Sequence, residues 1–366
     1  MKEYLKKHLI NIRGQNLKGR FLVIESDDWG SIRIPNPKVQ NELLVNGLIN
    51  LSDPFSAYDC LESGEDYKAL FDVLKSFKDS KGNHPIFTAN MVMANPDFEK
   101  INTNHYKSYY KEPFTKTYTK YYPGKGTFEV LKKGIEQNLI YPQYHAREHL
   151  NVTKWMQRLQ SGDERYLKAF HLNCFAIIDH SKENNRGNLM ASYDYQNEYE
   201  LNFINQSIIE GLQTFKELFG FTSKSTIAPC YVWNENIEKM FNETGVKSLQ
   251  SSYIQNKNGN GKYKRLWRSM GSTNELGQRY FLRNVLFEPA FNNNINWIEK
   301  AFESIAIAFF WGKPAIISSH RLNYVSGLSQ NNRDNTLQQL SELIGLVMRR
   351  WPDTIFLSSD KLLNVL

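Results

Sequence analysis

Short apolar runs alternate with segments of helical periodicity along most of the chain, and this alternation is the strongest constraint on its fold. The runs that we expect to form buried strands are Phe21–Glu25, His84–Ala89, Leu139–Tyr144, Cys174–Ile178, Ser225–Pro229, Val246–Ser251, Pro314–Ser319 and Thr354–Leu357. The segments with helical periodicity are Tyr67–Phe77, Thr127–Asn138, Asn205–Leu218, Asn234–Asn242, Trp297–Phe309 and Asn335–Arg350. This pattern predicts an α/β fold with parallel strands. Because the glycine pattern of dinucleotide-binding sheets is missing, we expect a distorted (β/α) barrel rather than an open sheet.

Two stretches interrupt the alternation, at about 96–126 and 255–296. We expect a single elaborated barrel over residues 1–366, with these stretches as long loop insertions, and long loops are often functional. The first stretch is rich in tyrosine, which suggests either a platform that stacks sugar rings or a small satellite core. Its tyrosines are Tyr106, Tyr109, Tyr110, Tyr118, Tyr121 and Tyr122.

Charge and cysteine content exclude some function classes. The chain has 45 Lys and Arg against 38 Asp and Glu, a net charge of +7. These charges are dispersed, and neither zinc-finger spacing nor an RNA-binding aromatic signature is present, so we expect no nucleic-acid partner. The three cysteines are far apart, which favours a reducing compartment over a disulfide scaffold. No apolar run has the length of a signal peptide or a membrane span, so we expect a cytoplasmic protein.

Two adjacent carboxylates end the first predicted strand. Phe21–Glu25 leads directly into Asp27 and Asp28. In barrels of this type the carboxyl ends of the strands face the active site. Adjacent like charges cost energy unless a cation or a shared proton compensates them. Asp27 and Asp28 are therefore candidates for catalysis or metal binding, although a solvated turn would give the same sequence.

Two histidines follow the strand Leu139–Tyr144 at a spacing of four residues. His145 and His149 can project on one side of a helical turn, a spacing that suits two imidazoles on one metal ion. Two imidazoles and one carboxylate are a recurrent ligand set of catalytic zinc sites. Together with Asp28, this pair predicts a metal centre.

Two further strand ends add candidate residues. Ile316–Ser319 runs into His320, which would lie at the same end of the barrel and could act as a general acid. Ile227-Ala-Pro-Cys-Tyr231 is another strand end, and it could supply a backbone donor to an oxyanion or be a simple turn.

In this order, the motifs resemble those of the polysaccharide deacetylase family, the NodB-homology type of carbohydrate esterase. Ser26-Asp-Asp-Trp-Gly30 is similar to the family strand ending T-F-D-D-G, with Trp29 intervening. His145-Ala-Arg-Glu-His149 is similar to H-[ST]-x-x-H, with Ala146 at the Ser or Thr position. The end of the chain, Ile355-Phe-Leu-Ser-Ser-Asp-Lys-Leu-Leu, also resembles the family's closing strand and helix start.

The resemblance implies a role for each matched residue. Asp27 would be the catalytic base and His320 the acid, while Asp28, His145 and His149 would bind one divalent metal ion, most often zinc. Pro229, Cys230 and Tyr231 would contact the substrate.

Two departures from the family pattern concern the groups that support the base and the acid. Ile227 stands where the family has an arginine that pairs with the base, so Arg147 or Arg321 would have to replace it near the substrate. The carboxylate that supports the acidic histidine has three candidates in this chain, Asp179, Asp194 and Glu288.

The resemblance implies a metal-dependent hydrolase of carbohydrate metabolism that removes an acetyl group from a sugar or glycan, with an N-linked acetyl group as the first candidate. One alternative is a glycosidase on a related barrel, which would need a second carboxylic acid such as Glu148. Another is a silent carbohydrate-binding barrel, an idea that the missing arginine favours. The expected partner is an N-acetylated carbohydrate.

Overall fold

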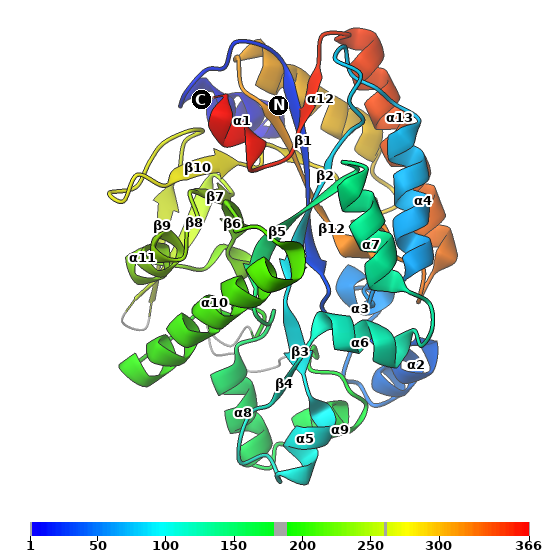
Figure 1. Ribbon diagram of the computed structural model, residues 1–366, viewed down its shortest axis with the longest axis vertical. Helices are drawn as coiled ribbons and strands as arrows, with labels where there is room; N and C mark the ends of the chain where they lie inside the picture. Colours follow the sequence, from blue (N-terminus) through cyan, green and yellow to red (C-terminus); the bar gives the residue numbers. More distant parts are fainter. Residues whose placement is uncertain (1, 179–188, 260–261, 366) are drawn as a thin grey trace.

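A curled nine-stranded sheet forms the centre of the molecule (Figure 1). The computed structural model describes residues 2–178, 189–259 and 262–365. The strand order is β10-β7-β6-β5-β2-β1-β12-β11, β13 pairs with the start of β1, and all these pairings are parallel. The strands are β1 (Phe21–Trp29), β2 (Phe87–Val92), β5 (Ile140–Ala146), β6 (Ser225–Ile227), β7 (Ser248–Ser251), β10 (Arg279–Leu282), β11 (Val285–Leu286), β12 (Ala315–His320) and β13 (Ile355–Leu357).

One short segment of chain carries both edges of this sheet. β10 pairs with β7 and β11 pairs with β12, yet only Arg283 and Asn284 separate β10 from β11. The Asn284 side chain accepts a hydrogen bond from the backbone N–H of Ile316 at 2.9 Å and donates one to the carbonyl of Pro314 at 2.9 Å. The sheet therefore curls round to this segment, and the predicted distorted (β/α) barrel is confirmed.

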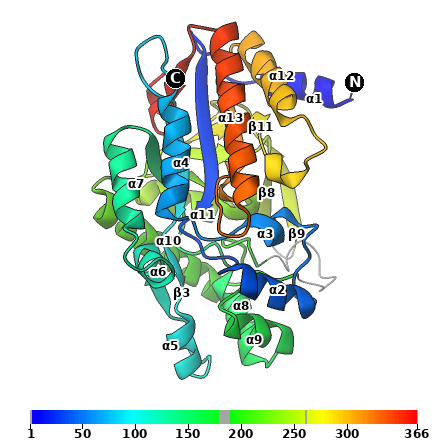
Figure 2. The same ribbon diagram turned by 90° about the vertical axis from the view of Figure 1, so that its right-hand side faces the viewer.

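Helices surround the sheet. In Figure 2, α4, α12 and α13 run along one side of it, and α10 lies on the other side in Figure 1. The α-helices are α1 (Lys2–Ile12), α2 (Pro37–Val45), α3 (Pro54–Tyr58), α4 (Gly64–Lys75), α5 (Phe98–Thr103), α6 (Phe114–Tyr121), α7 (Thr127–Glu136), α8 (Val152–Gln160), α9 (Glu164–His171), α10 (Glu198–Phe219), α11 (Glu235–Glu243), α12 (Trp297–Phe310) and α13 (Gln330–Arg350). The 3-10 turns are η2 (Pro229–Tyr231), η3 (Pro289–Phe291), η4 (Arg321–Asn323) and η5 (Lys361–Asn364).

Local sequence explains why these elements begin and end where they do. β1 is buried from Leu22 onward, as expected for a parallel strand covered on both faces, and its β-branched residues suit a strand. Ser63 and Asp66 form a reciprocal capping box that starts α4. α10 ends at Phe219 and is capped by Gly220, whose φ of +78° is the left-handed conformation that glycine adopts without strain.

Both predicted loop insertions contain regular structure. Residues 96–126 hold α5 and α6 and the strand β4 (Lys111–Pro113), which pairs antiparallel with β3 (Ala94–Pro96). Residues 255–296 hold most of the hairpin of β8 (Ile254–Gly259) and β9 (Lys262–Trp267), and then β10, β11 and η3. The expectation of a long loop at 255–296 was therefore wrong, because β10 and β11 are too short to produce a clear periodicity.

One predicted strand does not form. Within the described residues, Cys174–Ile178 lies outside every strand; Cys174 packs beside Leu43 and Leu48, and the backbone N–H of Ile178 donates to the carbonyl of Leu48. This apolar run covers a satellite core instead of joining the ladder. No helix in the described part of the chain has the length and apolar character needed to cross a membrane.

Candidate metal centre

The end of β1 places two neighbouring carboxylates at one mouth of the barrel. Side chains alternate along a strand, but the pairing of β1 with β2 shifts register between Ser26 and Trp29, and Asp28 has a φ of +76°. A positive φ at a residue other than glycine is strained, and such strain gathers at functional sites. This bulge turns the Asp28 carboxylate towards β5, while Asp27 stays on the side of Glu25.

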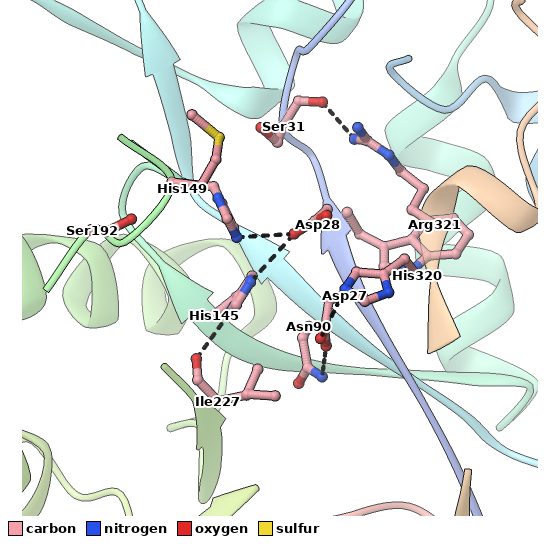
Figure 3. Close-up of polar contacts among 12 residues, drawn as sticks. Asp27, Asp28, Ser31, Asn90, His145, His149, Ser192, Ile227, His320 and Arg321 are labelled. Carbon is pink, nitrogen blue, oxygen red and sulfur yellow. Dashed lines mark hydrogen bonds and ion pairs between the residues drawn. The ribbon is translucent and has the colours of Figure 1, made fainter. Parts of the chain in front are cut away.

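The structure brings Asp28, His145 and His149 together. The Nε2 atoms of His145 and His149 lie 3.4 Å and 3.3 Å from the same oxygen, Asp28 Oδ1 (Figure 3). Among the described residues, these three form a buried group whose candidate ligand atoms all lie within 4.8 Å of one another. In a tetrahedral site with bonds of about 2.0–2.1 Å, neighbouring ligand atoms are about 3.3–3.4 Å apart, so the three side chains fit a zinc-sized ion.

Unsatisfied polar atoms support the same interpretation. Asp28 Oδ1 and His145 Nε2 are buried and have no hydrogen-bond partner within the described residues. The other ring nitrogen of His145, Nδ1, donates to the carbonyl of Ile227 at 2.8 Å, so Nε2, which faces Asp28, is the nitrogen available to a metal ion. Metal-bound histidines typically make such a second hydrogen bond. Buried polar atoms without partners are costly, and a bound cation would satisfy these.

The charges of this group suit a cation. Burial would raise the pKa of Asp28, but the facing imidazoles of His149 and His145 lower it well below its usual range, so Asp28 is ionised. Burial lowers the pKa of His149 to about 3, although Asp28 opposes this effect. A carboxylate and a neutral imidazole are the forms that bind a metal ion.

Asp27 is held by an arginine that the sequence analysis missed. Burial would raise the pKa of Asp27, but Arg283 lowers it to about 2. Two guanidinium nitrogens of Arg283 each donate to a different oxygen of Asp27 at 2.6 Å, and its Nε donates to Glu25 at 2.7 Å. Asn90 donates to Asp27 Oδ1 at 2.7 Å. Asp27 is therefore a fixed, ionised carboxylate beside the three candidate ligands.

The two arginines that we expected to support Asp27 form ion pairs with other carboxylates instead. Arg147 binds Glu148 at 2.7 Å and Glu210 at 2.6 Å, which ties the end of β5 to α10. Arg321 is completely buried, with Asp59 at 2.7 Å and Glu62 at 2.9 Å. Since both guanidinium groups are engaged in these ion pairs, the expectation that either one replaces the missing arginine was wrong.

His320 lies across from the ligand group, with its Nε2 atom 3.9 Å from Asp27 Oδ2. Its Nδ1 atom is 2.6 Å from Glu288 Oε1, so Glu288 is the supporting carboxylate among the three candidates. Asp194 pairs with Lys154 instead, and Asp179 lies outside the described residues. Burial would lower the pKa of His320, but Glu288 and then Asp28 and Asp27 raise it to about 9.

The turn after β6 contributes a carbonyl and a phenol. Ile227, at the position of the missing arginine, gives its carbonyl to His145. Cys230 and Tyr231 have φ values of +56° and +55°, two strained residues in the turn that begins at Pro229. The backbone N–H of Tyr231 donates to the carbonyl of Ala228 at 3.0 Å, which argues against this amide as an oxyanion donor. Burial raises the pKa of the Tyr231 phenol, which lies against Arg283 and Asp27.

The tyrosine-rich segment is mainly structural. Tyr106, Tyr109 and Tyr121 pack against the satellite core around Trp155. Tyr118 is buried in the main core, Tyr122 packs against it, and Tyr110 is 37% exposed. Three of these six rings therefore pack on the satellite core and two on the main core, so the segment forms no sugar platform.

Arg283 and Glu288 follow strands that the sequence analysis took for loop. The signal that could have found them is the one used elsewhere, an apolar run that ends in polar residues. Tyr280-Phe-Leu runs into Arg283, and Val285-Leu-Phe runs into Glu288. Both runs have only three apolar residues, which is too short to stand out from loop sequence.

No protein-family model matches the chain, and no curated protein matches it. Several solved structures are similar in backbone course. A 4-alpha-glucanotransferase from Thermococcus litoralis has 8% identity and a TM-score of 0.47; the match covers 95% of this chain and 41% of that enzyme, less than half of its length. The PuuE allantoinase has 12% identity and a TM-score of 0.43, over 93% and 88% of the two chains. The Xyl-CE4 domain of a multidomain xylanase from the hindgut metagenome of Trinervitermes trinervoides has 10% identity and a TM-score of 0.39, over 95% and 91%.

Proposed function

We propose that this protein is a divalent-metal-dependent hydrolase that removes an acetyl group from a sugar or glycan, with an N-linked acetyl group as the first candidate. One observation carries the proposal. Three buried candidate ligands share a mouth of the barrel with a clamped carboxylate, Asp27, whose Oδ2 atom lies 3.9 Å from the imidazole of His320. This arrangement offers a cation site, a proton acceptor and a proton donor within a few ångströms.

Asp28, His145 and His149 would hold the ion, and zinc suits this ligand set. When bound there, a divalent ion would supply Lewis acidity, which polarises a carbonyl oxygen and makes water more acidic. Asp27 accepts the proton of the attacking water, and Arg283 and Asn90 hold its oxygens in place for that transfer.

His320 donates a proton from Nε2 to the leaving nitrogen as the carbon–nitrogen bond breaks. Its other ring nitrogen is fixed by Glu288, and the side chain is 27% exposed, so a substrate can reach it. The products are acetate and a free amine on the sugar. With its pKa raised to about 9, His320 carries the proton it must donate at neutral pH.

The rival functions lose their support. A two-carboxylate glycosidase would need Glu148 as its acid, but Glu148 accepts two hydrogen bonds from Arg147 at 2.7 Å and 2.8 Å and is buried. The silent-barrel alternative rested on the missing arginine, and Arg283, directly after β10, pairs with Asp27 instead.

The test is acetate release from a panel of N-acetylated and O-acetylated sugars, with elemental analysis of the same purified protein. We expect about one equivalent of a divalent metal and acetate release from at least one N-acetylated sugar. Protein that holds the metal but releases acetate from none of the panel would overturn the proposal.

A further inference from the structure

A hollow of about 380 Å³ lies beside η3. It is lined by Tyr58 at the end of α3, by Pro289 of η3 and by the first three turns of α13. Figure 2 shows α3 beside the start of α13, and η3 packs against both helices. Sites for small ligands have volumes of about 300–1,000 Å³, so the hollow has room for one.

Carboxamide side chains dominate its lining. Asn331, Asn335 and Gln339 follow one another at a spacing of four residues, which places them in a row on one face of α13. Gln338 lies in the next row, and Asn293 faces them from the loop after η3. Within the described part of the chain, these five carboxamides make no hydrogen bond to another residue. Each therefore offers a free donor and a free acceptor.

The loop that carries Asn293 is held in place. The indole N–H of Trp297 donates to the carbonyl of Asn292 at 3.0 Å, and the side chain of Asn292 accepts from the backbone N–H of Asn294 at 2.9 Å. These two bonds fix the turn on either side of Asn293. A side chain on a fixed loop binds a ligand with less loss of conformational entropy than one on a free loop.

The chemistry of the lining selects the ligand. Glu342 is the one charged side chain among the lining residues, so the hollow offers no cation to an acidic ligand. Carboxamides donate to and accept from hydroxyl groups at once, and the half-buried ring of Tyr58 adds an apolar surface. A neutral, polyhydroxylated molecule fits this combination.

The hollow adjoins the candidate catalytic centre through η3. Glu288, the partner of His320, immediately precedes Pro289. The ring of Phe291, at the other end of η3, stacks on His320 with centroids 6.0 Å apart. Because Phe291 stacks on His320 while Pro289 lines the hollow, η3 contacts both, and the hollow lies next to the candidate catalytic centre.

We propose that the amide-lined hollow binds further units of a neutral oligosaccharide whose acetylated unit lies at His320. The link to His320 rests on the proposed function, whereas sugar binding in the hollow does not. The substrate is accordingly a neutral oligosaccharide chain rather than a single sugar or an acidic glycan.

The first test is calorimetric titration of the protein with cellotetraose, maltotetraose and N-acetylated chitotetraose, with tetragalacturonate as the acidic comparison. We expect at least one neutral tetrasaccharide to bind and the acidic one to bind more weakly. The double variant N335A/Q339A should lose about ten-fold or more in affinity, since it removes two hydrogen-bonding groups. Gln213→Ala, which removes an exposed carboxamide from α10, is the matched control and should bind as the wild type does. Absence of binding by every neutral tetrasaccharide, or equal binding by N335A/Q339A, would overturn the proposal.

The second test separates this proposal from the proposed function. For acetate release, N335A/Q339A should lower kcat/KM for N-acetylated chitotetraose about ten-fold and leave that for N-acetylglucosamine unchanged. If the wild type binds a neutral tetrasaccharide in the hollow but releases acetate from no sugar, the proposed function fails and the sugar site stands. If acetate is released and the variant treats both substrates as the wild type does, the sugar site fails and the proposed function stands.

Discussion

Arg283 and Asp27 face each other across the barrel with two parallel hydrogen bonds of 2.6 Å, although 256 positions separate them in the chain. Such a bidentate pair fixes the plane of the carboxylate as well as its charge. Asp28, the next residue, makes no comparable contact and turns to the two histidines instead. Two adjacent carboxylates thus have different surroundings, which is the basis for assigning them different roles.

This difference predicts that ligand and base variants fail in different ways. His149→Ala should yield folded protein that has lost most of its metal, because a three-ligand site loses one ligand. Asp27→Asn should keep the metal and lose roughly 10²–10⁴-fold in kcat. Elemental analysis and acetate release measure the two effects, and His171→Ala, an exposed histidine on α9, is the control. Loss of metal in Asp27→Asn together with its retention in Asp28→Ala would reverse our assignment.

Arg283→Lys tests the clamp itself. Lysine keeps the positive charge but not the two parallel donors, so Asp27 should lose its fixed orientation. We expect kcat for acetate release to fall about ten-fold or more, with metal content and fold unchanged. Arg279→Lys, at the half-buried start of β10, should keep wild-type activity. Equal activity of Arg283→Lys and the wild type would show that the orientation of Asp27 does not matter.

The pH dependence of kcat/KM for acetate release should report the protonation of His320. Its pKa is raised to about 9, so the protonated form that donates to the leaving group is present at neutral pH and is lost as pH rises through about 9. The groups that face the ring are Glu288, Asp27 and Asp28, together with the rings of Phe55 and Phe291.

Glu288→Gln removes the largest attraction for the proton on His320. The alkaline limb of kcat/KM should then move from about pH 9 towards the ordinary imidazole value of about 6.5. Glu288→Asp keeps the charge and should leave the limb much closer to its original place. An alkaline limb that stays near pH 9 in Glu288→Gln would mean that another group titrates there.

Arg321 should matter for stability rather than for substrate. Its guanidinium group binds Asp59 and Glu62 and also donates to the carbonyl of Ser31, all in the buried region behind Asp28. Arg321→Met would remove the cation that Asp59 and Glu62 share in the buried interior, at a cost of about 3–5 kcal/mol in the free energy of unfolding. Urea denaturation measures this cost, with Arg349→Met on the surface of α13 as the control. If Arg321→Met kept its stability but bound the substrate more weakly, Arg321 would have the role near the substrate that the sequence suggested.

The sequence alone predicts the fold class and the grouping of the three candidate ligands. Asp28 and His145 each follow a long apolar run, and so does the proposed acid His320. In a parallel barrel the ends of such strands meet at one mouth. Arg283 escaped prediction, and Glu288 could not be chosen over Asp179 and Asp194, because β10 and β11 have four and two residues, and periodicity needs a longer stretch. The helix α6 was not predicted because lysines and tyrosines alternate with threonines along it and give no clear apolar periodicity. In the structure Tyr118 is buried, whereas Lys116 and Lys120 are exposed.

The segment from Arg279 to Glu288 has a consequence for how this protein could be altered. The residue that orients the proposed base and the residue that charges the proposed acid lie only five positions apart, on the piece of chain where the two sheet edges meet. An insertion or deletion between them would disturb the registers of β10 and β11 together, and with them both steps of proton transfer. If these ten residues were grafted as one segment onto another barrel of this shape, they would bring both the arginine that orients the base and the carboxylate that charges the acid.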